Sequence, residues 1–151
     1  MKIKLTYLLL LGFLLTTCFT SNISYATTNT QIITRMDSNG GYWVETITTP
    51  QSIYGTKTQK TSTKTTKYYN ANDELCWKYS LTATFSVNTG VSATCTDSSA
   101  KLSIYKSGYS LYNEKHSHSG NKATGTIKIK HNGVVKAKTI SLTCTKNGTI
   151  S

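Results

Sequence analysis

The chain has 151 residues. If the first 26 are a cleaved signal, 125 remain, which fits one domain of average length and excludes a multidomain enzyme. Charged residues make up 15% of the chain, against roughly 25% in a typical soluble protein, whereas Ser and Thr supply 39 of residues 27–151. Of the 17 Lys and Arg residues, 15 follow position 26 and face 6 acidic residues, so the mature chain carries a formal charge of +9. This surplus favours anionic partners through a salt-sensitive attraction.

The first 26 residues have the pattern of a secretion signal. Lys2 and Lys4 precede an apolar stretch over residues 5–19, and Ser-Tyr-Ala at 24–26 places small residues at the −3 and −1 positions of a cleavage site. Polar residues from position 16 onward interrupt the stretch before it reaches the ~20 apolar residues of a membrane-spanning helix. We therefore expect a secreted, extracellular protein without a transmembrane anchor. A lipoprotein-like pattern at 15–18 leaves acylation of Cys18 open.

Strand patterns begin after a polar segment. Residues 27–40 predict a flexible lead-in that contributes one short strand over 31–36, and residues 41–151 the domain itself. The clearest strand covers 75–87, where every odd-numbered residue is apolar or aromatic, so one face enters a core and the other meets water. A polar Thr/Lys strand over 57–69 can pair with it through a turn at 70–73.

The C-terminal half continues the same pattern. Strands are predicted over 91–96, 101–106 and 109–115, and a hairpin over 122–130 and 134–145 flanks His131-Asn132-Gly133, a sequence typical of a type I′ turn. Seven to eight short strands predict an all-β fold, which we interpret as a single antiparallel β-sandwich. It is immunoglobulin-like only loosely, because an immunoglobulin tryptophan lies between the core cysteines and Trp77 precedes both.

Three cysteines remain after the signal, an odd number for an oxidising destination. Cys95 and Cys144 each continue an apolar strand face, so we predict one core disulfide between them. Cys76 falls on the solvent-facing side of its strand and is left over. It is interpreted as a free thiol, with an intermolecular disulfide or an exchange of partners as alternatives. The protein is accordingly expected to be a monomer or a Cys76-linked dimer.

Catalytic and metal-binding patterns are sparse. Glu114, His116 and His118 would share one face of a strand and could bind Zn or Cu. However, the expected hairpin register places His131 opposite residue 108 or 109, more than ~20 Å from His116, so the obvious fourth ligand is lost. We interpret this segment as a solvated loop. No histidine triad, paired carboxylate site or phosphate-binding loop is recognisable, so we expect neither an enzyme nor a cofactor.

Aromatic and basic residues remain as candidates for surface recognition. Tyrosines near strand ends and turns can present a flat ring to a sugar or a partner protein, and neighbouring lysines can contact anions, although both also occur as ordinary sheet composition. The candidate binding residues are Tyr68, Tyr69, Tyr105, Tyr109, Tyr112, Lys64, Lys67 and Lys106.

Several short motifs carry a resemblance. They are the Tyr68-Tyr69-Asn70-Ala71 turn, the Leu75-Cys76-Trp77 strand start, the Ala93–Thr96 and Leu142–Thr145 cysteine segments, and the hairpin over 119–124. With the signal, they resemble small secreted β-rich proteins of Gram-positive, clostridia-type bacteria, a group without an assigned activity. The resemblance covers roughly residues 57–151 and implies the Cys95–Cys144 pairing without implying a function.

The sequence therefore predicts a non-catalytic secreted binding module. Its partner is expected to be a cell-envelope polyanion or glycan, or a surface protein, and not nucleic acid, because no nucleic-acid-binding module is recognisable. Two alternatives stay open. One is a secreted effector with toxin-like or antagonistic action, and the other is a structural envelope protein crosslinked through Cys76.

Overall fold

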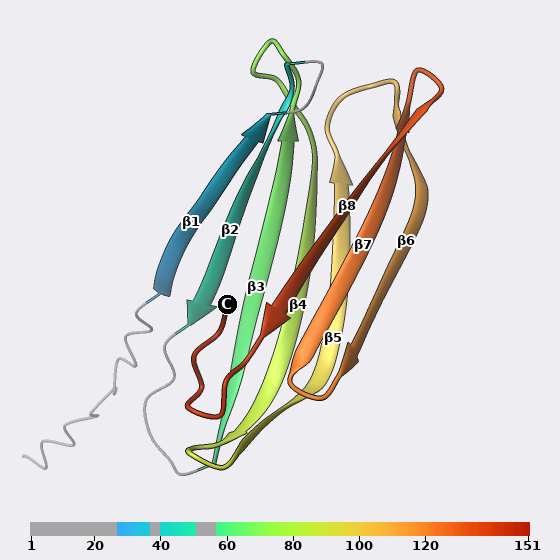
Figure 1. Ribbon diagram of the computed structural model, residues 1–151. Coiled ribbons are helices and arrows are strands. Elements are labelled where there is room, and N and C mark those ends of the chain that lie inside the picture. The colour runs from blue at the N-terminus through green and yellow to red at the C-terminus, as the bar shows by residue number, and fades with distance from the viewer. Residues whose placement is uncertain (1–26, 37–39, 51–56) are drawn as a thin grey trace, which may run out of the picture.

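The computed structural model describes residues 27–36, 40–50 and 57–151 (Figure 1). The predicted secretion signal and Cys18 lie outside these residues. The described residues form eight strands and no helix, which confirms the all-β prediction. The strands are β1 (Thr27–Met36), β2 (Tyr42–Pro50), β3 (Lys57–Tyr69), β4 (Leu75–Asn88), β5 (Ser92–Ile104), β6 (Tyr109–Ser119), β7 (Lys122–His131) and β8 (Val134–Thr143). No helix long and apolar enough to cross a bilayer occurs among them.

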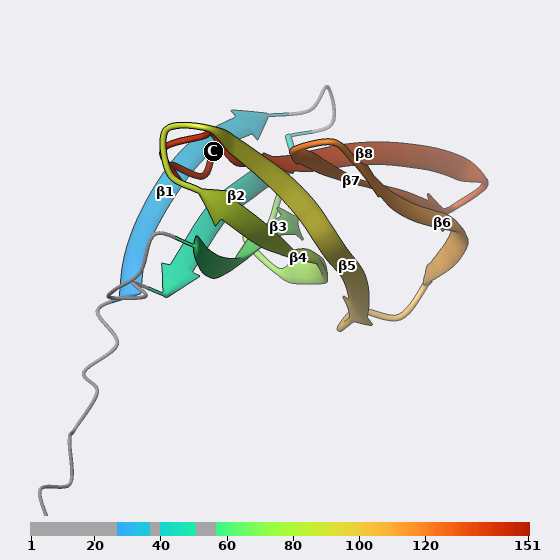
Figure 2. The same cartoon turned by 90° about the horizontal axis from the view of Figure 1, so that it is seen from below.

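The strands form two antiparallel sheets in strict chain order. The larger sheet has the order β1-β2-β3-β4-β5, and the smaller has the order β6-β7-β8. Viewed along the strands, the small sheet lies across from the curved large sheet (Figure 2). Contacts of β6, β7 and β8 with β3, β4 and β5 join the two sheets.

The core lies between the sheets and follows the period-two pattern. In β4 the odd-numbered residues from Trp77 to Val87 are buried, as predicted. In the small sheet, β7 and β8 contribute alternating buried residues to the same core. Since alternate side chains of a strand point to opposite faces, the intervening Thr, Ser and Lys residues form the outer faces of both sheets. The largest fully buried side chains include Trp77, Tyr79, Phe85, Leu81, Ile127, Ile129 and Leu142.

The tight turns were predicted from their residues. In the β7–β8 hairpin His131 pairs with Val134, and Asn132 and Gly133 between them have φ angles of 49° and 78°, the positive values of a type I′ turn. Asn70 begins the β3–β4 turn, in which its side-chain oxygen accepts hydrogen bonds from the backbone N–H groups of Asn72 and Glu74. Both turns lie at the same end of the molecule (Figure 1).

Strands β1, β5 and β6 are longer than predicted, and β6 continues to Ser119. The segments expected as separate strands over 91–96 and 101–106 are one strand, β5, because a bulge at Thr96 shifts its register against β4 and lets the pairing continue. Likewise, β1 pairs with β2 over most of its ten residues, where the sequence predicted a lead-in with a short strand.

The cysteines differ from the prediction in two respects. Cys76 is fully buried, not solvent-facing, because Tyr68 pairs with Trp77 and Tyr69 with Leu75, which leaves Cys76 as the extra residue of a bulge. Its carbonyl oxygen accepts hydrogen bonds from the N–H groups of Tyr105 and Lys106.

Cys95 and Cys144 both point into the core, as parity predicted, but the structure contains no disulfide among its described cysteines. Each thiol instead donates a hydrogen bond to a nearby backbone carbonyl, that of Asp97 for Cys95 and that of Thr145 for Cys144. The predicted Cys95–Cys144 bond is therefore corrected to two buried thiols. Burial raises the pKa of both, which keeps them protonated near neutral pH.

Candidate binding pocket

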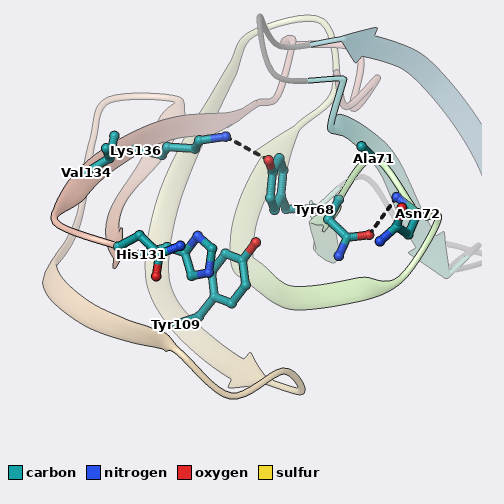
Figure 3. A pocket seen from close by; sticks show the side chains of 9 residues that line it. Tyr68, Ala71, Asn72, Tyr109, His131, Val134 and Lys136 are labelled. Atoms are coloured by element: carbon teal, nitrogen blue, oxygen red, sulfur yellow. Dashed lines mark hydrogen bonds between the residues drawn. The ribbon is translucent and has the colours of Figure 1, made fainter.

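A pocket opens between the two sheets at the end that carries the β3–β4 and β7–β8 turns (Figure 3). Its volume of about 350 Å³ lies at the lower end of the range for small-molecule sites. Side chains from both sheets form its walls, so the site exists only when the sheets are packed together. The lining residues are Tyr68, Asn70, Ala71, Asn72, Tyr109, His131, Asn132, Val134 and Lys136.

A stacked pair of rings forms one wall. The rings of Tyr109 and His131 lie 4.0 Å apart between centroids and only 5° from parallel. The β6–β7 register places these residues directly opposite each other, the register that the sequence predicted. Both side chains are half-buried, so the pair offers a flat, partly exposed surface that packing holds in place.

Lys136 and Tyr68 form the opposite wall (Figure 3). The Lys136 ammonium donates a 2.7 Å hydrogen bond to the Tyr68 hydroxyl and lies 4.7 Å from the centre of the Tyr68 ring. Tyr68 in turn packs against Trp43, Trp77 and Tyr109 at centroid distances of 4.8, 5.8 and 6.3 Å. The Lys136 ammonium therefore lies at the pocket in contact with an aromatic ring and a hydroxyl group.

Amide side chains supply the polar rim. Asn70 is committed to its own turn, because it also donates through its amide to Glu74 at 2.7 Å. Asn72 and Asn132 are exposed, and no hydrogen bond from either side-chain amide occurs among the described residues. Each amide can both donate and accept, so the rim can bind hydroxyl groups of a ligand.

The structure brings only two of the eight predicted binding residues into this pocket, Tyr68 and Tyr109. Tyr105 and Tyr112 are exposed, at 55% and 61%, and are not among its lining residues. Tyr69 stacks on Tyr42, with ring centroids 5.0 Å apart.

The three predicted lysines also lie elsewhere. Lys64 pairs with Glu45 at 3.5 Å, and Lys106 forms an ion pair with Glu74. Together with Asn70, Lys106 lowers the pKa of Glu74 below its ordinary value. Lys67 lies opposite Lys78, on the outer face of the large sheet.

Glu114, His116 and His118 lie on the paired strand β6 and not in the solvated loop that the sequence predicted, and they do not converge on one point. Glu114 and His116 share a 3.1 Å contact, whereas His118 contacts the hydroxyl of Ser98 at 3.1 Å. Within the described residues, no group of three or more His, Cys, Asp or Glu side chains is placed to hold a metal ion. A serine–histidine contact and a histidine–carboxylate contact are both present, but on different histidines, so they do not join into a catalytic triad.

Glu114 has a structural partner instead. The fully buried Tyr79 donates a 2.9 Å hydrogen bond to the Glu114 carboxylate. Burial and this bond raise the pKa of Tyr79, so its hydroxyl stays protonated and keeps donating. The interaction links β4 of the large sheet to β6 of the small sheet.

Sequence reasoning missed the pocket residues Asn72, His131, Asn132 and Lys136. The sequence did contain a signal for His131, because the predicted register set it opposite residue 108 or 109 and so close to Tyr109. That register was used only to exclude His131 as a metal ligand. Lys136 carried no local signal, because its role depends on how the small sheet packs over Tyr68.

Comparison of the chain with family models, with curated proteins and with solved structures returns no match.

Proposed function

We propose that this protein is a secreted, non-catalytic binding module that attaches to a glycan-bearing cell surface through the pocket between its sheets. The observation that carries the proposal is the stacked Tyr109–His131 pair at a site of about 350 Å³. Export rests on the signal pattern of the first 26 residues.

The chemistry of the walls favours a sugar. A rigid, partly exposed ring surface can cover the apolar face of a saccharide at low entropic cost, since the stack already fixes both side chains. The Asn72 and Asn132 amides can hydrogen-bond the hydroxyls at the edge of the same saccharide. This combination of an apolar platform and a few polar groups is the general pattern of small-ligand sites.

The charge of the chain favours an acidic sugar over a neutral one, because residues 27–151 carry a formal charge of +9 and attract anions at long range. At the pocket, the Lys136 ammonium lies over an aromatic ring and donates a hydrogen bond to a hydroxyl. A carboxylate or phosphate of the ligand can accept charge-assisted hydrogen bonds, which are stronger than bonds between neutral groups.

We also assign the fold to the β-sandwiches. Two sheets that bury their apolar faces in a shared core support this assignment. Both sheets keep the strands in chain order, whereas immunoglobulin domains contain Greek-key connections. The immunoglobulin-like description therefore covers only the layered packing.

The alternative of an envelope protein crosslinked through Cys76 is less favoured. The Cys76 thiol is fully buried at a bulge, and the Cys76 carbonyl accepts hydrogen bonds from the β5–β6 connection. An intermolecular disulfide would require this end of β4 to open. No structural feature described above specifically favours a toxin-like effector.

Titration calorimetry with neutral and uronic-acid tetrasaccharides tests the proposal. Tyr109→Ala should weaken binding at least tenfold, because buried aromatic contacts dominate interface energies. Tyr112→Ala, on the same strand but outside the pocket, is the matched control and should bind as wild type does.

Asn72→Ala provides a second test that does not depend on correct folding of the Tyr109 variant. Asn72 is exposed in a turn, so removal of its side chain leaves the core intact. It should weaken binding severalfold. Saccharide binding that survives both pocket substitutions, or an absence of binding to every tetrasaccharide, would refute the proposal.

A further inference from the structure

The outer face of the small sheet carries a second feature, separate from the pocket. Lys122, Lys128 and Lys130 alternate with the buried residues of β7, so they point away from the core. Lys115 of β6 pairs with Thr126 of β7 and joins the same face. All four lysines are exposed.

None of these four lysines has an ion-pair partner among the described residues. Strand register also places no acidic residue on this face. By contrast, Lys64 and Lys138 both contact Glu45 on the inner side. The outer face of the small sheet is therefore uniformly cationic.

The charges form a long row rather than a point. Lys122 and Lys130 are eight residues apart on one strand, about 26 Å at ~3.3 Å per residue. This distance exceeds the Debye length of ~8 Å at physiological salt, so one small anion cannot neutralise the row. A partner with many charges along an extended chain fits it better.

Hydroxyl groups fill the space between the lysines. Thr124 and Thr126 of β7 lie between Lys122 and Lys128 on this face, and the Thr126 hydroxyl shares a 2.9 Å hydrogen bond with that of Thr139 on β8. Such a surface can hydrogen-bond sugar hydroxyls while the ammonium groups contact acidic substituents.

The face also leads to the pocket. Lys130 pairs with Val135, and the next pair along the hairpin, His131 and Val134, lines the pocket. A chain that runs along the face would therefore reach the pocket at the β7–β8 turn.

We propose that this face binds a linear acidic polysaccharide. No aromatic side chain of β7 or β8 lies on it, and the exposed Tyr112 at the β6 bulge is a single ring, whereas single-stranded nucleic acid stacks successive bases on several rings. Polar side chains predominate, whereas insertion at a membrane interface requires a continuous apolar surface. The choice of a polysaccharide rests on the proposed function, but the lysines can bind without the pocket.

The test measures binding of polygalacturonate to the purified protein at several salt concentrations. The substitutions Lys115→Gln, Lys122→Gln, Lys128→Gln and Lys130→Gln in one variant should lower affinity at least tenfold and flatten the salt dependence. A matched control removes four charges elsewhere, through Lys67→Gln, Lys78→Gln, Lys101→Gln and Lys146→Gln, and should lose less than threefold. Equal losses in both variants would show a response to net charge alone and would overturn the proposal.

Two further ligands identify the partner class. A single-stranded oligonucleotide of equal charge and vesicles of anionic phospholipid should each bind more weakly than polygalacturonate. If either binds more tightly and depends on the same four lysines, the proposed partner is wrong.

Tyr109→Ala separates this proposal from the pocket function. If it leaves polygalacturonate binding unchanged while the four-lysine variant loses it, the cationic face stands whatever the tetrasaccharide result. If Tyr109→Ala alone abolishes polygalacturonate binding, the proposal that the cationic face binds the polysaccharide is wrong.

Discussion

The packing of Tyr79 over Gly125 provides a quantitative test of how the two sheets fit together. Gly125 is buried in β7, and a Cβ atom placed on it would stand 2.5 Å from the Tyr79 hydroxyl and 3.2 Å from two ring carbons. Gly125→Ala must therefore displace the Tyr79 hydroxyl from Glu114. A glycine is required here for space rather than for backbone conformation.

The size of the effect follows from two terms. Overpacking a well-packed core costs about 1–3 kcal/mol, and a buried hydroxyl that loses its partner costs about 1–3 kcal/mol. We therefore expect Gly125→Ala to lower the free energy of unfolding by about 3 kcal/mol and Tm by about 10 °C. In a Tyr79→Phe background the closest atom is gone, so the same substitution should cost only about 1 kcal/mol.

Urea unfolding of wild type, both single variants and the double variant measures this coupling. Tyr79→Phe alone should cost about 1–2 kcal/mol through the lost hydrogen bond. The two substitutions should be non-additive by about 2 kcal/mol, as expected for groups in direct contact. A cost of Gly125→Ala below about 0.5 kcal/mol, or an equal cost in both backgrounds, would refute this packing.

Three further predictions follow from local geometry. Gly41→Ala would bring a Cβ against the Tyr68 hydroxyl and to 2.9 Å from the Tyr69 carbonyl oxygen; it should cost about 1–3 kcal/mol in urea unfolding and also weaken saccharide binding. The lowered pKa of Glu74 adds stability above the ordinary carboxyl pKa that is lost as pH falls through the lowered value; urea midpoints between pH 6 and pH 3 should therefore fall less in Glu74→Gln than in wild type. The reduced protein should expose no thiol to Ellman's reagent until denaturant is added, and then three per chain after removal of residues 1–26, because Cys76, Cys95 and Cys144 are buried; rapid labelling of the native protein would contradict their placement.

Sequence patterns predicted the elements of this fold better than its irregularities. The alternation in β4 and the Asn132-Gly133 turn are local signals, and both appear as predicted. The burial of Cys76 depends on a bulge, which adds one residue and reverses the side-chain parity on which the prediction relied. The bulge at Thr96 likewise lets β5 continue through a segment with broken alternation.

The candidate site was only partly visible in the sequence for a related reason. Tyr68 and Tyr109 could be identified as aromatic residues near turns, but so could Tyr105 and Tyr112, which lie outside the pocket. Which tyrosines converge depends on the packing of one sheet over the other. That packing is set by long-range contacts such as Lys136 on Tyr68, for which a single sequence has no local pattern.

The most direct test of the pocket is a nuclear magnetic resonance titration of the ¹⁵N-labelled protein with a uronic-acid tetrasaccharide. We expect saturable shifts at the backbone amides of residues 70–72, 109 and 131–136, together with a shift of the His131 ring resonances. Shifts confined to other parts of the molecule, or none at saturating saccharide, would contradict a binding site at the Tyr109–His131 stack.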